Sequence, residues 1–182
     1  MYNTSVNHEQ LPERGLILAQ TGNEFAMACI VQSLLLTAAH VARGKPLFHA
    51  PDFSESNPMI LKPVQGQDLA HSDGPMVMRG FEVAIVPQLG QMLYIVGLHG
   101  REHRPFEIQV RVVELTKNHG VVVEWVSGDL PKPGMSGSPA LTENGEVVGL
   151  LVRAASEKGP HMFYLETVSP LLAEMHSRFL RR

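Results

Sequence analysis

The 182-residue sequence has one cysteine, few charged residues and no long apolar run, and each scarcity excludes a class of protein. A single cysteine, Cys29, excludes an internal disulfide and a zinc site built from several cysteines, so we expect a reducing, cytoplasmic location. No segment approaches the roughly 20 apolar residues of a membrane-spanning helix. The start of the chain also lacks the charged-then-apolar pattern of a secretory signal, and we expect no membrane partner.

Positive charge is scarce as well. The chain carries 15 Lys and Arg against 18 Asp and Glu, a formal net charge of -3. A nucleic-acid footprint normally needs a basic excess, so we expect no nucleic-acid partner. Only 18% of the residues are charged and 44% are hydrophobic, which is typical of a packed globular protein and argues against disorder.

Glycine and proline divide the chain into short apolar segments. The 16 Gly and 13 Pro are spread at short intervals, a pattern that favours an all-β sandwich or barrel. Within Phe106–Leu115 apolar and polar residues alternate, as in a half-buried strand. One helix is predicted near the C-terminus, with Ser169 as its cap and Pro170 at its first helical position. The predicted strands are Gly15–Gln20, Glu24–Gln32, Leu34–Thr37, Met59–Val64, Phe81–Val86, Met92–Leu98, Phe106–Leu115, Gly120–Val126, Glu146–Arg153 and Met162–Val168.

Two short motifs carry candidate chemistry. In the first, an apolar strand runs into two alanines and then His40, whose ring can project from the strand end. In the second, Ser136 lies on a glycine-flanked turn, where backbone amides can point at one position. Acyl transfer needs a hydroxyl beside a base, together with amide donors for the oxyanion that forms. The two motifs together therefore indicate acyl transfer by a serine nucleophile.

The motifs TAAHVA and GMSGSPA, followed by the strand GEVVGLLV and a C-terminal helix, resemble the chymotrypsin/trypsin superfamily of serine endopeptidases. Within the superfamily, the sequence resembles the compact, disulfide-free bacterial (HtrA-type) and viral members, and the resemblance covers roughly residues 15–180. The resemblance implies an all-β fold of two antiparallel β-barrels, each of the six-stranded type, with a short C-terminal helix. Residues 1–12 would form an N-terminal arm, 13–88 the first barrel, and 89–182 the second barrel with the helix. It also implies a protein or peptide substrate, an acyl-enzyme intermediate, no cofactor and no metal.

The resemblance assigns roles residue by residue. Ser136 would be the nucleophile, His40 the general base and then the general acid, and the amides of Gly134 and Ser136 the oxyanion hole. Asp68, in the sequence Asp-Leu-Ala, fits the place of the acid that orients the histidine. Glu82, which begins an apolar segment, is an alternative acid, and Asp73 is a third.

The resemblance also places a pocket for the residue before the scissile bond. Its walls would come from the segment just before the serine loop and from the strand that follows it. No acidic residue stands where trypsin-like enzymes carry one, so we expect a small-to-medium apolar residue there. The predicted pocket residues are Leu130, Val152, Arg153, Ala154 and Phe163.

Two other functions stay open at this point. The same fold could act without catalysis as a peptide- or protein-binding module. Alternatively, the protease could rest in an inactive state until a partner or an attached domain orders the loop Pro131–Ser136. Met135 stands where zymogen-activated relatives carry an aspartate that pairs with a new N-terminus, so activation by N-terminal clipping is not expected.

Overall fold

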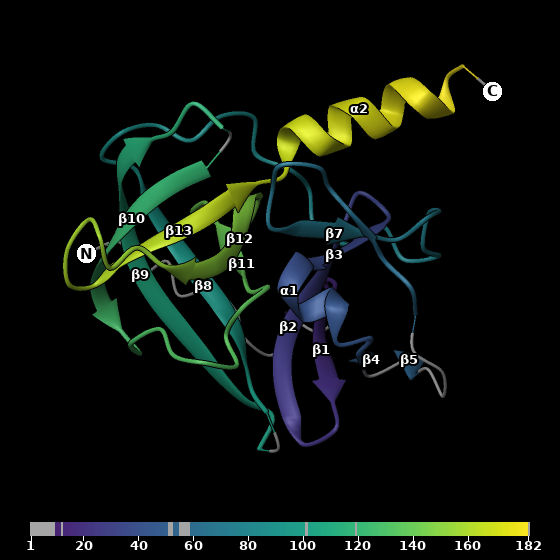
Figure 1. The fold of residues 1–182 in the computed structure, drawn as a ribbon, viewed down its shortest axis with the longest axis horizontal. Helices are drawn as coiled ribbons and strands as arrows, with labels where there is room; N and C mark the ends of the chain where they lie inside the picture. The colour runs from purple at the N-terminus through teal and green to yellow at the C-terminus, as the bar shows by residue number, and fades with distance from the viewer. Residues whose placement is uncertain are drawn as a thin grey trace.

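The computed structural model describes residues 10–11, 13–50, 53–54, 59–100, 102–118 and 120–181. The described chain forms two β-structures side by side, with one longer helix crossing at one end (Figure 1). The elements are β1 (Leu16–Thr21), β2 (Glu24–Val31), β3 (Leu34–Ala38), α1 (Ala39–Arg43), β4 (Leu47–Ala50), β5 (Phe53–Ser54), β6 (Lys62–Pro63), β7 (Leu69–His71), β8 (Met92–His99), β9 (Arg104–Leu115), β10 (Gly120–Gly128), β11 (Pro139–Leu141), β12 (Val147–Ala154), β13 (Met162–Thr167) and α2 (Ser169–Phe179).

The first half of the chain forms a seven-stranded antiparallel sheet in the order β5-β4-β1-β2-β3-β7-β6. The sequence predicted fewer strands here, whereas the described residues include four short strands of two to four residues, β4 to β7. Segments this short contain too few residues to show a period-2 pattern. The pairing that matters for function is β3 with β7, which sets Ala38 opposite Leu69.

The second half forms a closed six-stranded barrel in the order β10-β13-β12-β11-β8-β9. The alternation predicted for β9 is confirmed, because Phe106, Ile108, Val110 and Val112 are buried while Arg111 is exposed. The chain is thus all-β, with a second sheet, one closed barrel and a C-terminal helix.

The predicted strand Phe81–Val86 is wrong. Only isolated bridges occur there, from Phe81 to Val31 and from Val83 to Val147. The segment crosses from the sheet to the barrel, so its backbone bonds first to one half and then to the other. Its later apolar residues, Ile85 and Val86, are 85% and 66% exposed.

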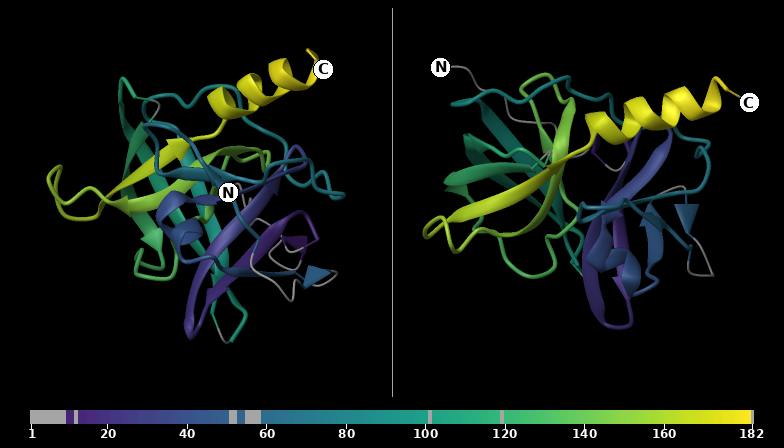
Figure 2. Two further views of the ribbon diagram at one scale, coloured as in Figure 1. Left: turned by 45° about the vertical axis from the view of Figure 1, so that its right-hand side comes forward. Right: turned by 45° about the horizontal axis from the view of Figure 1, so that its top comes forward.

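One apolar cluster joins the two halves and α2. Met27 and Leu36 of the sheet pack in the same buried cluster as Val96 and Leu150 of the barrel and Leu172 of α2. The helix leaves the barrel after β13 and lies over the sheet (Figure 2). Burial of this shared cluster fixes the two halves relative to each other, and therefore fixes any site built between them.

The two ends of the chain were predicted to be an N-terminal arm and a C-terminal helix. Residues 1–9 and 12 of the predicted N-terminal arm lie outside the described residues, whereas Leu11 is fully buried in the shared cluster. The predicted C-terminal helix is confirmed as α2, with Pro170 in its first turn. None of the helices in the described ranges is long and apolar enough to cross a bilayer.

Candidate active site

His40 is held by Asp68 at two points. β3 ends at Ala38, and the short helix α1 begins at Ala39, whose small buried side chain lets the chain turn closely there. The amide of His40 donates to Asp68 Oδ1 at 3.0 Å, and Nδ1 of the ring lies 2.7 Å from Asp68 Oδ2. Because an ionised carboxylate only accepts, Nδ1 carries the shared proton. Nε2 is therefore the atom of the neutral ring that can accept another proton.

Register and backbone hydrogen bonding bring these two residues together. Asp68 immediately precedes β7, which pairs with the end of β3. The carbonyl of Asp68 accepts a hydrogen bond from the amide of Ala39 at 3.1 Å. The acid and the histidine are therefore fixed by the sheet itself, although 28 positions separate them in the sequence.

The environment of Asp68 favours its ionised form. Partial burial tends to raise the pKa of this carboxyl group. The hydrogen bonds from the ring and amide of His40, together with the charges of His40 and Arg43, outweigh that effect, and the pKa is lowered. Asp68 thus stays a carboxylate to lower pH than an ordinary aspartate, and it can stabilise a protonated imidazole beside it.

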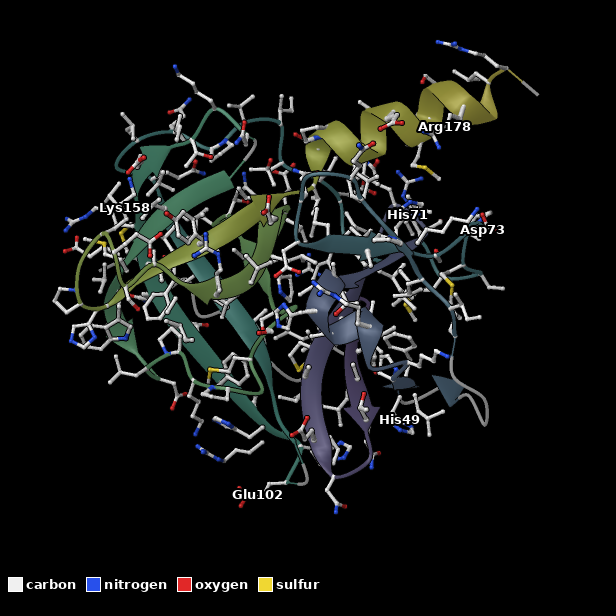
Figure 3. All side chains as sticks on the ribbon, in the orientation of Figure 1. His49, His71, Asp73, Glu102, Lys158 and Arg178 are labelled. Carbon is white, nitrogen blue, oxygen red and sulfur yellow. The ribbon has the colours of Figure 1, made fainter. Side chains whose placement is uncertain are left out.

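The two alternative acids lie with other partners. Glu82 accepts hydrogen bonds from Arg79 Nε at 2.7 Å and from Gln32 Nε2 at 3.3 Å. Asp73 lies in the loop that follows β7 (Figure 3) and forms an ion pair with Lys62 of β6. Of the three candidates, the described contacts bring only Asp68 to the ring of His40.

The serine loop leaves two backbone N–H groups without an acceptor. The amide of Met135 donates to the carbonyl of Lys132, and Gly134 between them has φ +97°, as in a type II turn with Pro133 in its second position. Within the described residues, the amides of Gly134 and Ser136 donate to no acceptor, while that of Met135 is bonded. The loop therefore has two backbone donors, one on either side of the bonded Met135 amide, that are available to a ligand.

The serine loop is attached to both halves of the molecule. The amide of Met27 on β2 donates to the carbonyl of Ser136 at 2.9 Å. The amide of Gly137 donates to the carbonyl of Leu151 on β12 at 2.7 Å. Gly137 has φ +88°, and a Cβ there would overlap the carbonyl oxygen of Met27. Glycine at this position is what allows β2 and the loop to approach so closely.

We therefore predict that Gly137→Ala lowers the free energy of unfolding by at least about 2 kcal/mol, from backbone strain and overlap combined. Chemical denaturation measures the change. Gly22→Ala is the matched control, because Gly22 also has a positive φ, +59°, but a Cβ added to it would have no other atom within 4 Å. Equal losses in the two variants would show that strain alone matters and that the close approach to Met27 does not.

His40 and Ser136 line one cavity of about 270 Å³, which also has Gly134 in its wall. The hydroxyl of Ser136 lies 3.5 Å from the carbonyl oxygen of Val152, a long hydrogen bond. Among the described contacts no hydrogen bond joins Ser136 to His40. The three predicted side chains are thus gathered at one place, with the serine turned toward β12.

A second cavity, of about 370 Å³, also has Ser136 in its wall. Four of the five predicted pocket residues line it, and Leu130, which is 49% exposed, does not. Lys132 also lines the cavity, although no motif in the sequence pointed to it. The lining residues are Pro131, Lys132, Pro133, Ser136, Leu151, Val152, Arg153, Ala154 and Phe163.

Other candidate groups are not arranged for chemistry. Cys29 is fully buried, and burial raises the pKa of its thiol, so it is not available as a thiolate. Across the described part of the chain, no group of three or more His, Cys, Asp and Glu side chains could hold a metal ion.

The sequence matches no protein-family model, and a comparison with curated proteins finds no match. Several solved structures are similar to this chain in their fold. The serine endoprotease from Yersinia pestis aligns with a TM-score of 0.70 at 12% identity, over 97% of this chain and 68% of that one. Kallikrein-related peptidase 10, in a complex with Zn²⁺, aligns with a TM-score of 0.71 at 15% identity, over 98% of this chain and 100% of that one. Tobacco etch virus protease complexed with product aligns with a TM-score of 0.66 at 14% identity, over 92% of this chain and 78% of that one. The chain therefore has a chymotrypsin-like fold, as the two motifs predicted.

Proposed function

We propose that this protein is a serine endopeptidase in which Ser136, His40 and Asp68 act as a triad. The observation that carries the proposal is the pairing of Asp68 with the ring of His40, which lines the same cavity as Ser136 and Gly134. The similarity in fold to several proteases supports it at a coarser level.

In this proposal rotation about the Cα–Cβ bond of Ser136 moves its hydroxyl from Val152 toward His40. Nε2 of His40 accepts the hydroxyl proton as the oxygen attacks the substrate carbonyl. The oxyanion that forms is stabilised by the free amides of Gly134 and Ser136. The protonated ring, held by Asp68, then gives its proton to the leaving amine. Water releases the acyl group in the same way, and the reaction needs no cofactor.

The apolar walls of the 370 Å³ cavity support a preference for a small-to-medium apolar residue before the scissile bond. Burying an unpaired charge there is costly, and the side chains of Lys132 and Arg153 would repel lysine or arginine. We expect peptides with Ala, Val or Leu at this position to be cleaved at least about tenfold faster than peptides with Lys or Arg.

Digestion of a peptide library, with cleavage sites read by mass spectrometry, tests both the activity and the preference. Phe163→Ala enlarges the cavity and should shift the preference toward larger apolar residues. Preference for Lys or Arg in the wild-type protein would show that the cavity is assigned wrongly. Preference for Asp or Glu would show that Lys132 and Arg153, and not the apolar walls, set the selectivity.

A second candidate function is a protease at rest that a partner or an attached domain activates. The observation favouring it is the hydrogen bond of the Ser136 hydroxyl to Val152, which turns the hydroxyl away from His40. A resting enzyme would hydrolyse no peptide alone and would react only once a bound partner or an attached domain rotated Ser136 toward His40. Activity of the isolated chain on the peptide library decides against this candidate.

A further inference from the structure

A second carboxylate lies next to the proposed triad acid, and it comes from the other half of the molecule. Glu166 on β13 accepts a hydrogen bond from the backbone amide of Asp68 through Oε1 at 3.3 Å. Its other oxygen, Oε2, accepts from Gln67 Nε2 at 3.4 Å. One side chain of the barrel thus bonds to two consecutive residues of the turn that carries the acid.

Glu166 also belongs to the strands that carry the serine loop. β13 pairs with β12, where Leu150 lies opposite Glu166. The next residue, Leu151, accepts the hydrogen bond from Gly137. A continuous path of backbone hydrogen bonds therefore runs from the loop of Ser136 to Glu166, whose side chain bonds to the turn of Asp68.

Stability does not account for a carboxylate at this place. Burial raises the pKa of Glu166, and the negative charge of Asp68 raises it further, while the bonds from Asp68 and Gln67 and the charge of Arg153 only partly oppose this. An acid whose folded-state pKa is raised destabilises the fold at pH values where it is ionised, and this cost is lost as the pH falls through that pKa. A neutral residue of similar shape would fold at least as well.

We propose that Glu166 is a positioning residue of the active site. It holds the Gln67–Asp68 turn against the barrel, so that the Asp68–His40 pair and Ser136 share one rigid frame, and it places a negative charge beside that pair. This inference rests on the proposed function, since positioning has a purpose only if His40 and Ser136 react together.

The charge of Glu166 should affect the pH dependence of the reaction. The charged or titratable groups that face Asp68 are His40 and Arg43 on α1, and those that face Glu166 are Asp68 before β7 and Arg153 on β12. A negative charge at Glu166 favours the protonated ring of His40, which is the inactive form of the base. Removing that charge should move the acid limb of the pH–rate profile to lower pH.

Two substitutions separate the hydrogen bonds from the charge. Glu166→Ala removes both, and we expect kcat to fall about tenfold with KM changed less than about twofold, because the acid is misplaced and the substrate pocket is not. Glu166→Gln keeps an oxygen that accepts from the Asp68 amide, and we expect kcat within about threefold of wild type, with the acid limb at lower pH. Glu124→Gln is the matched control and should change neither quantity. This partly exposed glutamate pairs with Arg111, and it lies on β10 opposite Met162, at the other end of β13 from Glu166.

A readout that does not depend on turnover keeps this inference separate from the proposed function. In a Ser136→Ala background, the proton shared by His40 Nδ1 and Asp68 Oδ2 should give a low-field ¹H NMR signal. We expect Glu166→Gln to retain this signal and Glu166→Ala to broaden or lose it. If the wild-type chain shows the signal but cleaves nothing, the proposed function fails and the NMR comparison still tests the positioning.

Three results would overturn the inference. The first is Glu166→Ala with wild-type kcat and an unchanged low-field signal. The second is Glu166→Gln with an acid limb at the wild-type pH. The third is a loss in Glu166→Gln as large as that in Glu166→Ala, since the amide oxygen should rescue positioning. If Glu166→Ala does not fold, the kcat and pH profile of Glu166→Gln decide.

Discussion

Replacing Ser136 by alanine should lower kcat by on the order of 10⁴- to 10⁶-fold, because the variant has no oxygen to attack the substrate. The free amides of Gly134 and of residue 136 remain, so a small residual rate over water is expected. The fold should be unaffected, since the only described hydrogen bond of this hydroxyl is the long one to Val152. The measurements are kcat on a peptide substrate and the thermal unfolding temperature.

Ser138→Ala is the matched control for this prediction. Its hydroxyl lies in the same loop, but it is buried without a hydrogen-bond partner in the described residues. Removing an unpaired buried hydroxyl costs no hydrogen bond, so turnover and unfolding temperature should stay close to wild type. Wild-type turnover in Ser136→Ala would show that another group is the nucleophile.

Replacing Asp68 by asparagine should lower kcat by about 10⁴-fold at neutral pH. An asparagine amide can donate to Nδ1 of His40, which would place the ring proton on Nε2, where it blocks acceptance of the serine proton. The amide oxygen of asparagine can still accept from the backbone of His40, so the geometry of the turn should be kept. The pH–rate profile and circular dichroism together separate a chemical loss from a folding loss.

The other two candidate acids provide the controls. Glu82→Gln and Asp73→Asn remove exposed ion pairs with Arg79 and Lys62, which contribute little to stability. Both variants should keep kcat within about twofold of wild type. A loss near 10⁴-fold in Glu82→Gln, with Asp68→Asn unaffected, would require a different arrangement of the site from the one described.

The strongest local patterns predicted the parts of the structure they cover. The alternation in β9 predicted its buried face, because a half-buried strand repeats every two residues. The two motifs around His40 and Ser136 predicted the fold, since each depends on small residues at a tight turn. The segment at Phe81–Val86 failed for a physical reason, because its apolar residues cross between two structures and are not all buried.

The contacts between distant residues could not be predicted. Glu166 lies 98 positions from Asp68, and nothing around it in the sequence marks it as a neighbour of the acid. Lys132 lines the cavity beside Ser136 only because of how the proline-rich segment folds back. The resemblance favoured Asp68 over Glu82, but the contact of Asp68 with His40 depends on the pairing of β3 with β7, which is a property of the sheet.

Reaction with a fluorophosphonate probe tests the central claim most directly, because the probe reacts preferentially with a serine that a neighbouring base activates. We predict that the intact chain gains one probe, that tryptic mapping places it on Ser136, and that His40→Ala and Ser136→Ala prevent it. A chain that folds and stays unlabelled alone and in the presence of peptide, or a probe found on any other residue, would contradict the account.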